Sequence, residues 1–136
     1  MSASGLLGEV GVRVVVTGGA GFIGANLCRL LVERGVEVAV IDDLSSGERD
    51  NLAGLPVQLR VASILDSDAL HAVCADADSI VHLAARASVP LSLDDPAGTH
   101  EVNATGTLRV LDAARRSGAY VVVETAAVRA AKPKDR

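Results

Sequence analysis

Three glycines at intervals of three residues, followed by a carboxylate, are the residues best suited to chemistry. Gly18, Gly21 and Gly24 lie where a β-branched run ends and an amphipathic segment begins. Glycine at these points permits a tight turn, a close approach of a pyrophosphate to the backbone, and close packing of a helix on a sheet. The amide groups that open the following helix attract an anion. The pattern predicts a phosphate-binding turn.

An acidic residue closes the next predicted strand. Asp42 follows Gly24 by eighteen residues, where a carboxylate accepts hydrogen bonds from ribose hydroxyls and repels a 2′-phosphate. The combination favours a dinucleotide site for NAD over NADP, with a merely structural turn as the alternative. Asp43 either shares the ribose role or is a solvated loop acid.

Elements of two kinds alternate along the chain and must position these residues. Apolar and β-branched runs predict strands at 12–17, 36–41, 57–61, 79–83 and 120–124. Helical spacing predicts helices at 22–34, 66–74 and 99–116, the last after a loop containing Pro90 and Pro96. The polar segment 42–54 is predicted to be a loop with one helical turn near Asn51.

This alternation is typical of βαβ units. It predicts an α/β fold, namely a Rossmann-type doubly wound parallel sheet of about five strands in the order 3-2-1-4-5, in three layers. Such a sheet binds its ligand between the first and fourth strands, at their carboxyl ends. We expect one domain over residues 1–136, with 1–11 and 127–136 as flexible tails.

Composition narrows the class of protein further. The hydrophobic fraction is 49%, yet Phe22 and Tyr120 are the only aromatic residues, so the core must consist of small aliphatic side chains. A net charge of −4 argues against nucleic acid as a partner. No apolar run approaches the ~18 residues that span a bilayer, and no signal peptide is evident, so we expect a cytoplasmic protein without a membrane partner. Two isolated cysteines, Cys28 and Cys74, predict no metal site.

Four ordered motifs carry a resemblance to a known family. They are TGGAGFIG at 17–24, IDDLSSG at 41–47, VHLAA at 81–85 and HEVNATGT at 100–107. Together they resemble the extended short-chain dehydrogenase/reductase family, and within it the NAD-dependent sugar-nucleotide epimerases and dehydratases. The resemblance covers residues 12–125 and implies that NAD is the cofactor.

The resemblance implies a role for each matching position. Phe22 and Ile23 would lie beside the pyrophosphate, and Leu83, Ala84 and Ala85 would line the cofactor. Ala62-Ser63-Ile64 replaces the family's usual Gly-Asp-Ile at the adenine, where a hydroxyl binds more weakly than a carboxylate. Asn103 corresponds to a position near the nicotinamide, or only caps a helix. The implied cofactor-binding residues are Gly18, Gly21, Phe22, Ile23, Gly24, Asp42, Asp43, Ser63, Ile64, Leu83, Ala84, Ala85 and Asn103.

The catalytic part of the family pattern is incomplete. Thr125 falls at the family's catalytic Ser/Thr, or is a threonine that ends a strand. No Tyr-x-x-x-Lys occurs, so the acid/base and the C-terminal substrate-binding region are expected to be absent. His82 is expected to be a hydrogen-bonded core residue rather than an acid or base. Arg86 is expected to be a solvated loop residue, with contact to a phosphate as the alternative.

Three functions remain open from the sequence. The first is the NAD-binding part of an epimerase/dehydratase-type oxidoreductase acting on nucleotide sugars, shortened before the catalytic tyrosine and inactive alone. The second is a stand-alone, non-catalytic dinucleotide-binding or regulatory module, and the third is a non-functional structural fragment. The nucleotide sugar would bind only in a longer parent protein. A bare fifth strand at the sheet edge also predicts self-association.

Overall fold

Five parallel strands form a single sheet in the order β3-β2-β1-β4-β5, which confirms the predicted order. The computed structural model describes residues 11–123. The predicted tails therefore lie almost wholly outside the described residues, and Thr125 lies outside them too. The strands are β1 (Arg13–Thr17), β2 (Glu37–Asp42), β3 (Gln58–Val61), β4 (Ser79–His82) and β5 (Tyr120–Val123).

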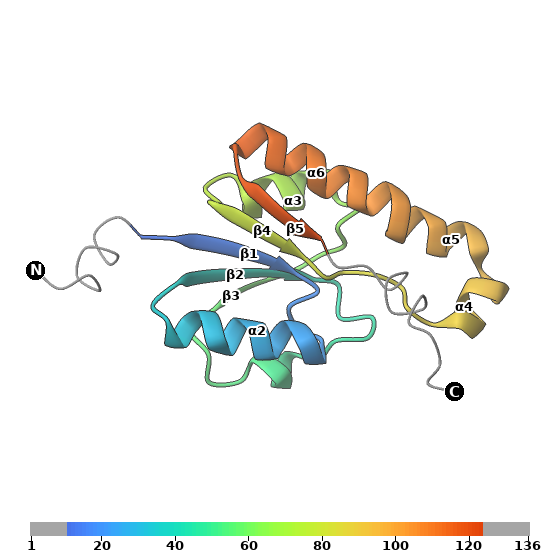
Figure 1. Ribbon diagram of the computed structural model, residues 1–136. Helices are drawn as coiled ribbons and strands as arrows, with labels where there is room; N and C mark the ends of the chain where they lie inside the picture. Colours follow the sequence, from blue (N-terminus) through green and yellow to red (C-terminus); the bar gives the residue numbers. More distant parts are fainter. Residues whose placement is uncertain (1–10, 124–136) are drawn as a thin grey trace, which may run out of the picture.

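Helices cover both faces of this sheet and make the three predicted layers (Figure 1). One face carries α2 (Phe22–Glu33) and the short 3-10 helix η1 (Arg49–Leu52), the helical turn predicted near Asn51. The other face carries α3 (Ser67–Cys74) and α6 (Gly106–Ser117). Right-handed crossovers place successive helices in this way.

The core divides into two clusters because side chains alternate along each strand. Val15 of β1 joins Ile41, Leu70, Ile80 and Val110 beneath α3 and α6. The flanking Val14 and Val16 pack on the opposite face with residues of α2, including the fully buried Cys28. Aliphatic side chains thus fill both interfaces, as the composition indicated.

The segment between β4 and α6 is more helical than predicted. It holds α4 (Val89–Asp94), α5 (Pro96–His100) and the π-helix η2 (Glu101–Thr105), which runs into α6. Pro90 and Pro96 lie in the first turns of α4 and α5, where a missing amide hydrogen costs nothing. Ser88 and Asp95 cap these helices by accepting from backbone amides. The prediction of a loop here was wrong because the prolines start helices instead of interrupting one.

Strand register brings the candidate site residues to one edge of the sheet. Thr17 aligns with Ile41 of β2 and with His82 of β4, and Asp42 aligns with Val61 of β3. Four strands therefore end at about the same level, on the right-hand side of the sheet in Figure 1. Within residues 11–123, no helix is long and apolar enough to cross a membrane.

Candidate functional site

A cavity of about 570 Å³ opens at the carboxyl ends of β1, β2, β3 and β4. Its volume is typical of sites that bind small molecules and cofactors. Asn103 does not line it, but every other predicted cofactor residue does: Gly18, Gly21, Phe22, Ile23, Gly24, Asp42, Asp43, Ser63, Ile64, Leu83, Ala84 and Ala85. The tertiary structure thus assembles residues that are up to 67 positions apart in the chain.

Two of the three glycines are required by the fold itself. Gly18 has φ +70°, and a β-carbon there would lie 2.8 Å from the amide nitrogen of Ala84. A β-carbon on Gly24 would collide with the Gly18 carbonyl oxygen and lie 2.6 Å from the α-carbon of Gly19. Helix α2 can therefore approach the end of β1 only because both positions lack a side chain.

Gly21 differs from the other two glycines. A β-carbon at Gly21 would meet only the Gly18 carbonyl oxygen, at 3.4 Å, which is an ordinary contact. Gly21 precedes α2 as its N-cap, and no side chain caps the helix there. The amides of the first turn, beginning at Phe22, therefore have no side-chain partner at the wall of the cavity. The fold does not need glycine at this position, whereas close approach of a ligand to the backbone does.

Asp42 is buried, and its carboxylate holds the glycine turn in place. One oxygen, Oδ2, accepts from the backbone amide of Ala20 at 3.0 Å, and the other, Oδ1, accepts from that of Leu44 at 2.8 Å. A carboxylate has about four acceptor sites, so the group can still accept from a ligand in the cavity. The sequence signalled an acid at this strand end but not its bond to the glycine turn.

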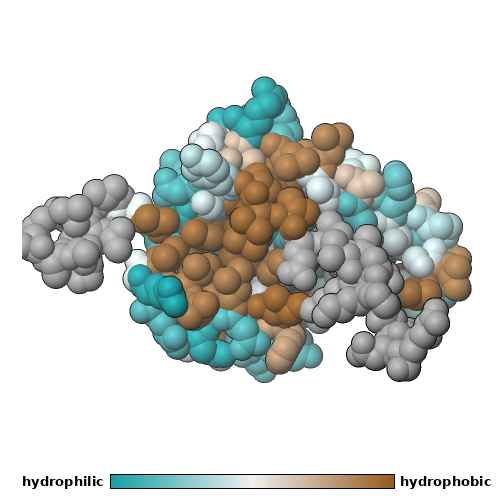
Figure 2. Space-filling model, in the orientation of Figure 1, coloured by the Kyte–Doolittle hydropathy of each residue, from teal (hydrophilic) through white to brown (hydrophobic). Residues whose placement is uncertain are grey.

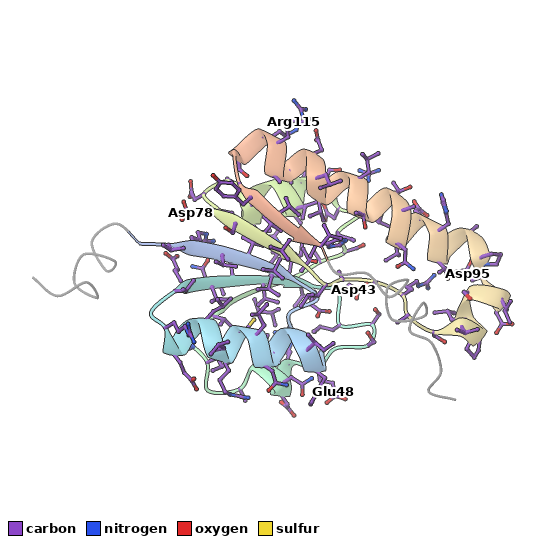
Figure 3. All side chains as sticks on the ribbon, viewed as in Figure 1. Asp43, Glu48, Asp78, Asp95 and Arg115 are labelled. Carbon is purple, nitrogen blue, oxygen red and sulfur yellow. The ribbon has the colours of Figure 1, made fainter. Side chains whose placement is uncertain are left out.

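Asp43 lies beside Asp42 with its side chain exposed, at the carboxyl ends of the strands in Figure 3. Its Oδ1 accepts from both the amide and the hydroxyl of Ser45, at 3.0 and 2.7 Å. These bonds close a local turn over residues 43–45. The following residues up to Gly47 also line the cavity, although the sequence did not single out the segment 45–47 as binding.

The end of β3 supplies a hydroxyl and an apolar side chain. Ser63 Oγ accepts from the amide of Leu65 at 3.1 Å, which leaves its own hydrogen free to donate. Ile64 is buried in the core and packs against Gly106 of α6, where a β-carbon would lie 2.5 Å from Ile64 Cδ1. Ser63 is therefore the polar group of this wall, and Ile64 anchors it to the helix layer.

The end of β4 forms the opposite wall, and its backbone is held by Thr17. The Thr17 hydroxyl oxygen accepts from the amides of Leu83 and Ala84, each at 3.1 Å. The Leu83 amide also donates to the Thr17 carbonyl at 3.1 Å, which continues the pairing of β1 with β4. Small side chains at 84 and 85 leave room in the cavity.

Asn103 makes a pair of bonds that the sequence did not predict. Its Oδ1 accepts from the amide of Arg86 at 2.8 Å, and its Nδ2 donates to the Arg86 carbonyl at 3.0 Å. Asn103 lies inside η2 and not at a helix end. The Asn103 side chain therefore clamps the chain that follows β4 and does not cap a helix end, and Asn103 also lines a second cavity that shares Ala84 and Ala85 with the first.

Arg86 contributes a cation to the cavity lining and is paired with a carboxylate. Its Nη1 lies 3.1 Å from Oδ2 of Asp95, which lies beside α4 and α5 in Figure 3. The amide of Gly98, and after it Arg86, lowers the pKa of the Asp95 carboxyl. The expectation of a solvated arginine was incomplete because it missed this partner, which is nine residues away along the chain.

His82 is only 1% exposed and is hydrogen-bonded on both ring nitrogens. Its Nδ1 lies 2.6 Å from Thr17 Oγ1, and its Nε2 lies 3.0 Å from Thr107 Oγ1. Burial lowers the pKa of the imidazole to about 4, so it is neutral at pH 7. The prediction of a hydrogen-bonded core histidine is confirmed.

The described residues 11–123 contain no group of three or more His, Cys, Asp or Glu side chains that could hold a metal ion. The cavity instead combines free amides at a helix start, a strand-end carboxylate, a hydroxyl and small apolar side chains. Amides suit phosphate, and the carboxylate suits sugar hydroxyls. This set of groups can bind and orient a nucleotide.

Comparison with known proteins finds one family profile and several relatives that match most of the chain. The profile of the family described as "NAD dependent epimerase/dehydratase family" matches residues 14–135. The UDP-glucose 4-epimerase of Mycolicibacterium smegmatis is 42% identical over 120 residues, which are 84% of this chain and 38% of that protein. UDP-glucuronic acid decarboxylase 1 of Arabidopsis thaliana is 37% identical over 123 residues, 90% of this chain and 28% of the relative.

A solved structure agrees with the sequence comparison. The UDP-glucose 4-epimerase of Thermus thermophilus, crystallised in complex with NAD, superposes with a TM-score of 0.73 at 39% identity. The match covers 79% of this chain and 35% of the epimerase. The chain thus spans about a third of the length of the proteins that it matches.

Proposed function

The chain belongs to the NAD-dependent epimerase/dehydratase family, and from this membership we propose that its cavity binds NAD as the cofactor part of an oxidoreductase for nucleotide sugars. One observation carries the proposal. The glycine turn with the start of α2 and the Asp42 carboxylate come from separate parts of the chain and meet at one cavity. Relatives named as UDP-glucose 4-epimerase and UDP-glucuronic acid decarboxylase support the sugar-nucleotide class of substrate.

The order of the strands sets the direction in which the dinucleotide lies. Across the sheet edge, the lining runs from Ser63 after β3, through Asp42 at the end of β2 and the glycine turn after β1, to Leu83 after β4. With a pyrophosphate at the turn, Asp42 and Ser63 would hold the adenosine, and Leu83 would line the nicotinamide half. The buried negative charge of Asp42 opposes a 2′-phosphate, so NAD binds more tightly than NADP.

The described residues fit this cofactor. The fold does not require glycine at position 21. The absence of a side chain there leaves the backbone open at the wall where the pyrophosphate would lie. Asp42 keeps acceptor capacity after bonding two amides. Ser63 Oγ accepts from the Leu65 amide, and its hydroxyl would contact the base at the position where the family usually has an acid.

NAD, when bound, would supply a nicotinamide ring able to take a hydride from a sugar carbon and return it. The chain's own residues bind the cofactor, orient it and line the cavity with small groups. His82 is neutral and buried, and both of its ring nitrogens are hydrogen-bonded to threonines. It therefore does not transfer a proton to or from the substrate. Thr125 remains the predicted hydroxyl group for the substrate and lies outside the described residues.

Three further expectations belong to this proposal. They are a single domain over residues 1–136, a cytoplasmic location, and self-association through β5. The last is supported by exposure at the sheet edge, where Tyr120 is 81% and Val122 is 60% exposed. Figure 2 shows apolar side chains gathered over this part of the sheet.

The test compares Gly21→Ala with Gly24→Ala. NAD binding is measured by calorimetry and thermal unfolding by circular dichroism. Gly21→Ala should lower NAD affinity roughly tenfold or more and leave the unfolding temperature unchanged, because its new methyl group meets only one atom of the fold at 3.4 Å. Gly24→Ala should lower the unfolding temperature itself. Unchanged affinity in Gly21→Ala, or no NAD binding by the wild-type chain at millimolar cofactor, would refute the proposal.

A further inference from the structure

A continuous chain of hydrogen bonds runs behind the β4 wall of the cavity. It starts at the amides of Leu83 and Ala84, which donate to Thr17 Oγ1 at 3.1 Å. It continues from Thr17 to His82 Nδ1 at 2.6 Å and from His82 Nε2 to Thr107 Oγ1 at 3.0 Å. It ends where the Thr107 hydroxyl donates to the carbonyl of Asn103 at 2.6 Å.

The direction of every bond follows from the last one. A carbonyl oxygen only accepts, so the single hydroxyl hydrogen of Thr107 points to Asn103. Thr107 must then accept from His82, which places the imidazole hydrogen on Nε2. Nδ1 is therefore an acceptor, and the Thr17 hydroxyl donates to it while its oxygen accepts from the two amides. With the imidazole hydrogen on Nε2, every N–H and O–H group in this chain of hydrogen bonds has an acceptor. With the hydrogen on Nδ1, the Thr17 hydroxyl would have no acceptor in the chain.

Asn103 of η2 also holds the other end of the β4 wall, at Arg86. The Asn103 side chain accepts from the Arg86 amide at 2.8 Å and donates to the Arg86 carbonyl at 3.0 Å. Residues 83–86 are thus tied at both ends to Asn103, at one end through its carbonyl and the histidine, and at the other through its amide group. Of the two connections to Asn103, the one through the buried His82 ring joins strand β4 itself to the helix layer.

We propose that His82, as the Nε2–H tautomer, is a positioning residue that sets where Leu83, Ala84 and Ala85 stand against the nicotinamide half of NAD. This role rests on the proposed NAD site. His82 touches neither cofactor nor substrate and acts through Thr17. If its link to Thr107 is lost, the Leu83 end of the wall loses its tie to the helix layer, while the Arg86–Asn103 clamp, the glycine turn and Asp42 keep their own bonds.

The experiment uses the full chain with two substitutions of one residue. Thr107→Val removes the hydroxyl at nearly constant volume, and Thr107→Ser keeps it. Nitrogen-15 NMR reports the tautomer of His82, and calorimetry reports the affinities for NAD and for ADP, which lacks the nicotinamide half. We expect Nε2–H in the wild-type chain, and in Thr107→Val a roughly tenfold loss of NAD affinity with ADP affinity unchanged. Thr107→Ser should retain both wild-type affinities.

Several results would overturn the assignment. A wild-type Nδ1–H tautomer would do so without any variant, which decides the matter even if Thr107→Val fails to fold. Equal losses of NAD and ADP affinity would show a general effect on the fold, and unchanged NAD affinity in Thr107→Val would remove the positioning role alone. By contrast, a wild-type chain that binds neither ligand would refute the proposed NAD site.

Discussion

Acidification should destabilise the folded chain mainly through one buried imidazole, that of His82. Burial lowers its pKa from the ordinary 6.5 to about 4. The unfolded chain therefore takes up a proton as the pH falls through 6.5, and the folded chain does so only near pH 4. The stabilising contribution is fully present above pH 6.5 and is lost as the pH falls toward 4.

The size of the effect follows from the displacement of the pKa. Each pKa unit corresponds to about 1.4 kcal/mol. The free energy of unfolding therefore falls by about 2 kcal/mol between pH 7 and pH 5, and by about 3 kcal/mol between pH 7 and pH 4. Neighbouring hydrogen bonds to Asp95 and Asp112 lower the pKa values of these carboxyls as well. Their contributions are lost only below the ordinary carboxyl value of 3.8, outside this window.

Urea unfolding between pH 7 and pH 4.5 measures the effect as a free energy of unfolding. His82→Gln should be less stable at pH 7 but nearly independent of pH in this range, because it cannot titrate. His100→Gln, which removes an exposed imidazole, is the matched control and should keep the wild-type slope. The reasoning would be refuted if the free energy of unfolding changed with pH equally in the wild type and in His82→Gln.

Three other perturbations test separate parts of the structure. Gly24→Ala should cost about 1–3 kcal/mol in urea unfolding, since its β-carbon collides with backbone atoms; wild-type stability would contradict the close packing of α2. Asp42→Asn should lose about 1–3 kcal/mol, because the backbone amide of Ala20 or that of Leu44 loses its acceptor, and NAD affinity should fall in calorimetry. Asp43→Asn, at an exposed neighbour, is its control, and equal losses of stability in both would be the adverse result. Val122→Lys should abolish concentration-dependent association in analytical ultracentrifugation; a wild-type chain that stays monomeric would remove the predicted β5 contact.

Local chemistry explains why much of the fold could be predicted from the sequence. The turn at 17–24 joins a strand to a helix within eight residues, so the glycine spacing alone indicates both the turn and the start of α2. The order β3-β2-β1-β4-β5 follows from the alternation of elements and the handedness of crossovers. Proline is ambiguous in this respect, since it both ends and begins helices, and the segment at α4 and α5 was predicted wrongly for that reason.

Polar partnerships, in contrast, were decided only by the tertiary structure. The sequence predicted that His82 is buried, because it ends an apolar strand. Its partners Thr17 and Thr107 are 65 and 25 positions away along the chain. The same holds for Asn103, whose amide group clamps Arg86, 17 positions away along the chain. Periodicity reports which face of an element is buried, whereas a hydrogen bond needs two atoms within about 3 Å and aligned, and only the packed sheet and helices set that distance.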